Sequence, residues 1–129
     1  MMTKPDRVWN RAAMQEDVSS LGRGDRALAS LLLFHGLVMN GGLHHALESV
    51  KPEELLAAVD GYAFFGFDDV AALLRAADSD PVLGTVTDDM EVAANARYAK
   101  TVPDDSHLVA RFEKVYAELS DQFAPVDEA

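Results

Sequence analysis

The sequence contains no cysteine among its 129 residues. This absence excludes disulfides and thiol catalysis, and with them the zinc-ribbon and iron–sulfur sites that need thiolate ligands. Long apolar runs are also absent, since the longest, residues 31–39, is interrupted by His35 and is far shorter than the roughly 20 residues of a membrane-spanning helix. No apolar core follows the basic residues of segment 1–11, so this segment does not resemble a signal peptide. We therefore expect a soluble cytoplasmic protein with no membrane partner.

Positive charge is scarce and unevenly placed. The chain has 11 Lys and Arg against 22 Asp and Glu, which gives a net charge of −11. Residues 1–45 hold five basic and four acidic side chains, whereas residues 46–129 hold six basic and eighteen acidic ones. Such a field repels nucleic acids and membrane surfaces and attracts basic surfaces. The charge therefore predicts no direct binding of nucleic acid and favours a basic protein as the partner.

Apolar residues recur at helical spacing along nearly the whole chain, and they make up 49% of it. This content is ample for a hydrophobic core, and the length is that of one domain. We predict an all-α fold: a compact bundle of about six or seven helices that forms a single domain over residues 1–129. The ends, residues 1–5 and 125–129, are expected to fray.

The segment of residues 25–39 is apolar on nearly every side, which is typical of a buried central helix. We expect Asp25 to cap this helix. The triplet Asn40-Gly41-Gly42 follows it, and both residue types accept left-handed backbone angles. The triplet therefore predicts that the helix ends here and that the chain turns sharply into a short helix over residues 43–50.

Other helix starts are marked by proline and by acidic residues. Pro52 predicts a helix with Glu53 and Glu54 in its first turn, where carboxylates suit the helix dipole. Leu56 is expected on the inner face of that helix, together with Leu55 and Val59. The remaining predicted helices are a first one outlined by residues 8–16, one capped by Asp68, a weaker one over residues 88–100, and a last one capped by Asp105 or Ser106.

Three segments carry a resemblance to a known family: residues 31–45, the aromatic stretch 61–67, and the Ala/Leu-rich run 71–77. Their content and order resemble the bacterial DNA-mimic-protein family over residues 26–78, and more loosely around Tyr98 and segment 103–105. In that family a helix ends in Asn-Gly-Gly before a bulky residue and a polar pair. This chain differs in having Leu43 and Ala46 where the family usually has aromatic residues. The resemblance implies an all-helical acidic domain, a DNA-mimic role and a possible homodimer.

Two histidines and one glutamate are the candidate metal ligands. Glu48 lies four residues after His44 on the same face of a helix, and His35 lies one element earlier. These three residues could form part of a helical carboxylate–histidine site, although the second half of such a site is missing from the sequence. The simpler interpretation is that His35 is a hydrogen-bonded core residue and that His44 braces the turn. We expect no metal and no other cofactor.

The sequence contains no nucleophile-elbow, phosphate-loop or calcium-loop pattern, so we favour a non-enzymatic protein. Carboxylates three or four residues apart on a helix stand roughly 5–6 Å from each other, which allows a helix to imitate a track of phosphates. We therefore predict an acidic partner-binding surface and a DNA mimic that sequesters a DNA-binding protein. Its residues are Glu53, Glu54, Asp60, Asp68, Asp69, Asp78, Asp88, Asp89, Glu91, Glu113, Glu118 and Asp121.

Three alternatives stay open. An acidic surface suits the inhibition of a basic toxin by an immunity-type protein equally well. The three candidate ligands would make the chain a small metal-binding protein or a metal-dependent enzyme. An acidic surface can also serve solubility alone.

Overall fold

Six α-helices and one short 3-10 helix make up the part of the chain that the structure describes. The computed structural model describes residues 3–14, 21–78, 88–102 and 104–126, with the backbone alone at residues 77, 78, 88–91 and 94. The elements are α1 (Lys4–Ala13), α2 (Arg23–Ser49), α3 (Pro52–Phe64), α4 (Asp68–Asp78), α5 (Asp88–Thr101), α6 (Asp105–Glu118) and the 3-10 helix η2 (Ser120–Gln122). The predicted all-α class is confirmed.

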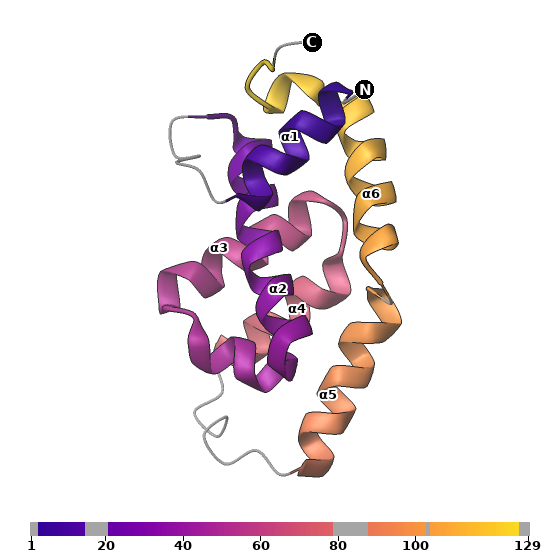
Figure 1. Cartoon of the computed structure of the whole chain (residues 1–129). Coiled ribbons are helices and arrows are strands. Elements are labelled where there is room, and N and C mark those ends of the chain that lie inside the picture. The colour runs from indigo at the N-terminus through magenta and orange to yellow at the C-terminus, as the bar shows by residue number, and fades with distance from the viewer. Residues whose placement is uncertain (1–2, 15–20, 79–87, 103, 127–129) are drawn as a thin grey trace.

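Helix α2 is the axis of the bundle (Figure 1). Helix α3 lies along one side of α2, α4 lies behind it, and α5 and α6 follow each other along the opposite side. Helix α1 packs across the N-terminal end of α2. Leu28, Leu31 and Phe34 of α2 are almost completely buried, because neighbouring helices surround this part of α2. The predicted buried central helix is therefore present.

The sharp turn predicted at Asn40-Gly41-Gly42 is confirmed at Gly42. The element α2 consists of two helical parts that meet at a kink at Gly42, whose φ of 92° and ψ of 172° are not helical. This backbone conformation is essentially restricted to glycine. The N–H of Leu43, just after the kink, donates to the side-chain oxygen of Asn95 on α5 at 2.8 Å. The triplet therefore ends the first helical part and turns the chain into the second, residues 43–49, and a distant side chain supports the turn.

Counted across its kink at Gly42, the 27-residue element α2 is long and apolar enough to cross a membrane by length and composition alone, unlike the stretch 31–39 considered by itself. The central helix of a bundle meets the same criteria, and this is the position that α2 occupies (Figure 1).

Three helix starts differ from the predicted ones. Gly22, not Asp25, precedes α2, and Asp25 is the third residue inside it. Asp104 caps α6 by accepting from the N–H of His107 at 3.1 Å, whereas Asp105 and Ser106 were predicted to do so. Asp68 is the first residue of α4 and not the residue before it. Each position lies within one turn of the predicted one, so the acidic signal located the helix start but not the capping residue.

Helix α3 begins as predicted, with Pro52 in its first turn, and the N–H of Lys51 donates to Glu54 Oε1 at 2.8 Å. Leu56 was expected on the inner face of α3, but its side chain is 53% exposed, so this prediction is wrong. Helix α1 starts at Lys4, inside the segment expected to fray, and ends at Ala13. Glu16, predicted in the first helix, lies outside the described residues.

The aromatic residues predicted to pack at the α3–α4 turn are largely in the core. Tyr62, Phe65 and Phe67 are buried, and Phe65 contacts Phe112 of α6 and Phe123, with ring centroids 6.2 and 6.4 Å apart. This cluster joins the α3–α4 turn to the C-terminal part of the chain. It therefore fixes the position of α6, which carries several of the acidic residues considered below.

Candidate partner-binding surface

The predicted acidic surface can be placed residue by residue for eight of its twelve members. Seven of these side chains are exposed and Glu54 is half-buried; the side chains of Asp78, Asp88, Asp89 and Glu91 lie outside the described residues. The exposed members are Glu53 and Asp60 on α3, Asp68 and Asp69 on α4, Glu113 and Glu118 on α6, and Asp121 on η2. They lie on both sides of the bundle, because α3 and α6 flank α2 from opposite sides (Figure 1).

A cleft of about 870 Å³ lies where α4, the end of α5 and α6 meet, and its charge is mixed. Asp68 and Asp69 contribute carboxylates to it, and His107, Arg111 and Lys114 of α6 contribute nitrogen-bearing side chains. Carboxylates of α4 and cationic side chains of α6 therefore line the same cleft. The cleft is therefore not a part of the surface that could imitate a row of phosphates.

Arg111, which lines this cleft, connects α6 to the α3–α4 turn. Its Nη1 donates to the carbonyl oxygen of Phe65 at 2.9 Å, and its guanidinium carbon lies 4.9 Å from the centroid of the Phe67 ring. Both contacts tie α6 to the α3–α4 turn, and the second is a cation–π contact. These contacts of the Arg111 side chain therefore help to fix the position of α6 against the α3–α4 turn.

A second hollow of about 550 Å³, between α2 and α3, brings Asp60 close to two cations. Arg23 and Arg26 of α2 line it together with Asp60. The guanidinium carbon of Arg23 lies 5.5 Å from the centroid of the Phe64 ring. Of the predicted α3 residues, Asp60 is thus the one that lies among positive charges.

Two exposed carboxylates were absent from the predicted surface, Asp104 and Asp105 at the start of α6. Their side chains are 62% and 79% exposed. Hydrogen bonds from the Ser106 hydroxyl and from the backbone and ring of His107 lower the pKa of Asp104. The sequence signal was present, but it was assigned to capping alone.

One acidic residue of α2 is completely buried and belongs to no surface. Asp25 Oδ1 accepts from Nη2 of Arg11 on α1, and its Oδ2 accepts from the N–H of Gly22 at 2.9 Å and the N–H of Ala124 at 2.7 Å. Asp25 therefore joins α1, the start of α2 and the C-terminal segment.

His35 is buried and both of its ring nitrogens are engaged. Its Nε2 lies 2.7 Å from Asp105 Oδ1 and its Nδ1 lies 2.7 Å from the Tyr98 hydroxyl, which in turn contacts the Tyr62 hydroxyl. A carboxylate can only accept, so a neutral His35 donates from Nε2, Nδ1 accepts from Tyr98, and Tyr98 accepts from Tyr62. Burial raises the pKa of Tyr62 well above its usual value and also raises the pKa of Tyr98. This chain of hydrogen bonds links α2, α3, α5 and α6.

The other two candidate metal ligands lie together but apart from these contacts. His44 Nε2 is 2.9 Å from Glu48 Oε1, and His44 Nδ1 has no hydrogen-bond partner within the described residues. Among the residues that the structure describes, no group of three or more His, Asp or Glu side chains could hold a metal ion. The structure thus pairs His44 with Glu48 and gives His35 different partners.

Comparison with known proteins identifies the family. The chain matches the model of the DMP19-like protein family over residues 19–129. The chain belongs to the DMP19-like protein family. No match was found among curated proteins, and none among solved structures.

The matched range of this DMP19-like protein includes α2 through η2, and α1 lies outside it. It contains the kinked helix and the aromatic turn on which the resemblance to DNA-mimic proteins was based. Family membership is consistent with that resemblance and with a protein partner.

Proposed function

We propose that this DMP19-like protein is a non-enzymatic interaction protein that binds the basic surface of a DNA-binding protein in the cytoplasm and so acts as a DNA mimic. One observation carries the proposal: seven of the predicted carboxylates are exposed on helices, in a chain with a net charge of −11. Membership of the DMP19-like family supports it.

Carboxylates held on packed helices suit this role because their positions are fixed before binding. Helices α3 and α6 are anchored by buried residues such as Val59 and Phe112, so their exposed side chains stand on rigid supports. A DNA-binding surface that has evolved for phosphates would meet anionic oxygens in place of DNA. Ion pairs of this kind release counterions and weaken steeply as salt rises.

The two clefts that contain cations do not suit a phosphate-like surface. The proposed partner-binding surface is therefore limited to carboxylates that lie outside these clefts. Glu53 on α3 lies away from the cations of the α2–α3 hollow, and Glu113 and Glu118 of α6 do not line the cleft that holds Arg111. Helices α3 and α6 lie on opposite sides of α2 (Figure 1), so one binding event with a single DNA-binding face would engage one of them more than the other.

The test is a competition experiment. Basic DNA-binding proteins, each bound to a labelled duplex, are titrated with the DMP19-like protein over a salt series from about 50 to 200 mM. We expect the duplex to be released from at least one of them at low salt, with a loss of competition as salt rises. Release of no duplex even at the lowest salt would contradict the proposal.

Two charge-matched variants separate a specific surface from general repulsion. Glu53→Gln with Glu54→Gln removes two charges from α3 and leaves an amide oxygen at position 54 to accept from the N–H of Lys51, and Glu113→Gln with Glu118→Gln removes two charges from α6. Both pairs change the net charge equally, so a difference between them reports which helix contacts the partner. We expect one pair to weaken competition much more than the other. Equal weakening would mean that the net charge acts without a defined surface.

A further inference from the structure

One side of α2 is buried at its start and exposed in its middle. Asp25, Ala29, Leu32, Gly36 and Met39 are spaced four or three residues apart, so they share one side of the helix. The first two are buried, Leu32 is half-buried, Gly36 is exposed and Met39 is 57% exposed. Asp25 is bound by Arg11 of α1, so α1 covers the first part of this side. Beyond α1 the described residues leave the same side exposed at Gly36 and Met39.

Gly36 is unexplained by the packing of the described chain. A Cβ built at Gly36 would meet no atom within 4 Å, and the positive-φ glycines of the described residues are Gly42 and Gly66. An exposed glycine inside a helix costs roughly 1 kcal/mol relative to alanine. Glycine is useful where another backbone or side chain must approach closely. The position therefore suits contact with a second molecule.

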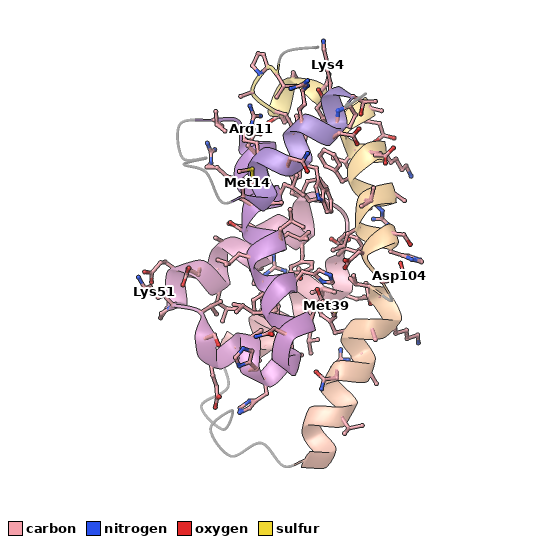
Figure 2. The ribbon with its side chains drawn as sticks, in the orientation of Figure 1. Lys4, Arg11, Met14, Met39, Lys51 and Asp104 are labelled. Carbon is pink, nitrogen blue, oxygen red and sulfur yellow. The ribbon has the colours of Figure 1, made fainter. Side chains whose placement is uncertain are left out.

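The exposed side of α2 is uncharged over residues 27–47; carboxylates at the start of α6 border one edge of it, and exposed Arg26 precedes its N-terminal end. No Asp, Glu, Lys or Arg occurs in residues 27–47. Half-buried Leu33 and Leu37 extend the apolar area around Gly36. His35, one turn before Met39, holds the carboxylate of exposed Asp105 at 2.7 Å, so the start of α6 borders this area. Figure 2 shows Met39 on α2 and Asp104 at the start of α6 facing the same side of the molecule.

We propose that this apolar face of α2, defined by Leu32, Leu33, Gly36, Leu37 and Met39, is the docking site for an amphipathic helix whose apolar strip is flanked by Lys and Arg. The inference rests on the proposed function, because it assigns this helix to the basic partner. Interfaces commonly combine an apolar centre with a polar rim, and a helix laid in an apolar groove is a recurrent mode of recognition.

Charge decides between this occupant and a second copy of the chain. Two copies that met through this face would bring together two acidic borders and two chains of net charge −11. Like charges at an interface oppose association, whereas lysines and arginines beside an apolar strip match the border formed by Asp104 and Asp105. The apolar contact also adds a part of the affinity that salt does not screen.

The experiment uses two model peptides of about 18 residues with an identical leucine face. One carries lysine at its polar positions and the other carries glutamate. Binding of each labelled peptide is measured by fluorescence anisotropy at about 0.15 M salt. Gly36→Gln and, separately, Met39→Gln change the proposed face without changing the charge. Ala72→Gln places the same side chain at an exposed position of α4 as the matched control.

We expect the lysine peptide to bind and the glutamate peptide not to bind. We expect Gly36→Gln and Met39→Gln to weaken the lysine peptide about tenfold or more, and Ala72→Gln to leave its affinity unchanged. Circular dichroism should show native helix content for the variants. Equal affinities in all variants, or no binding of the lysine peptide, would overturn the inference.

Analytical ultracentrifugation, which measures the oligomeric state, tests whether a second copy of the chain occupies this face instead. A native dimer that Gly36→Gln converts to monomers would show that a second copy occupies the face, which would also overturn the inference. The peptide result and the duplex-release result are independent. Release of duplex together with equal peptide affinities would leave the proposed function standing and remove the docking site.

Discussion

The strongest stability prediction concerns the buried carboxylate of Asp25. Its side chain is completely buried and accepts hydrogen bonds from Arg11, Gly22 and Ala124. Asp25→Asn keeps the size of the side chain but removes its charge, so the guanidinium of Arg11, itself only 16% exposed, loses its counter-ion. Removing one partner of a buried ion pair typically costs about 3–5 kcal/mol.

This loss is large for a domain of this size. Single domains are stable by about 5–15 kcal/mol, and urea reduces the stability of small proteins by about 1–3 kcal/mol per molar. We therefore expect Asp25→Asn to lower the urea midpoint by about 2 M, measured as loss of the helical circular-dichroism signal. The unfolding slope should stay the same, since the surface exposed on unfolding does not change.

Asp6→Asn is the matched control for this prediction. Asp6 also accepts a backbone N–H, from Thr3 at 3.0 Å, but its carboxylate is exposed. Its substitution should lower the midpoint much less than Asp25→Asn does. A midpoint for Asp25→Asn equal to that of Asp6→Asn would refute the conclusion that Asp25 joins α1, α2 and the C-terminal segment.

Three further predictions concern the kink and the buried tyrosines. Gly42→Ala should lower the free energy of unfolding by about 1–3 kcal/mol, because a φ of 92° with a ψ of 172° strains any residue with a Cβ; an unchanged urea midpoint would mean that the kink is wrongly described. Asn95→Ala should cost about 1–3 kcal/mol by leaving the N–H of Leu43 unpaired, and Asn95→Asp, which keeps an acceptor oxygen, should recover much of that loss in the same assay. Because the folded state raises the pKa of Tyr62 and Tyr98, their contribution to stability is complete below pH 10 and falls as pH rises above it; absorbance at 295 nm should show both ionising together with loss of helix, and their ionisation in the intact fold would contradict the burial.

Local patterns in the sequence were sufficient for most of the fold. The apolar run of α2, the proline that starts α3 and the aromatic residues around Phe65 each act within one or two turns of chain, so periodicity and helix-start rules locate them. The contacts that decide the details are not local. Asn95 supports the kink from 52 residues beyond Leu43, and Asp25 is held by Ala124 from 99 residues away. No spacing rule could have paired them.

The candidate partner-binding surface likewise has features that local sequence predicts and features that depend on distant contacts. That Glu53 and Glu113 are exposed follows from the apolar residues on the opposite sides of their helices. That cations share a cleft with Asp68 and Asp69 does not follow from the sequence, because it depends on the docking of α6 through Arg111 onto the α3–α4 turn. Sequence periodicity predicts which side chains face outward, but tertiary packing decides which of them share a surface.

The central claim is that exposed helical carboxylates of this DMP19-like protein replace DNA on a basic protein surface. The most direct measurement is the binding constant between the two proteins as a function of salt concentration, for the native chain and for the α3 and α6 charge pairs. We predict that the logarithm of the constant falls linearly with the logarithm of salt, and that one pair makes the slope shallower by about one for each phosphate-like contact removed. A constant that does not depend on salt, or a slope that neither pair alters, would contradict the claim.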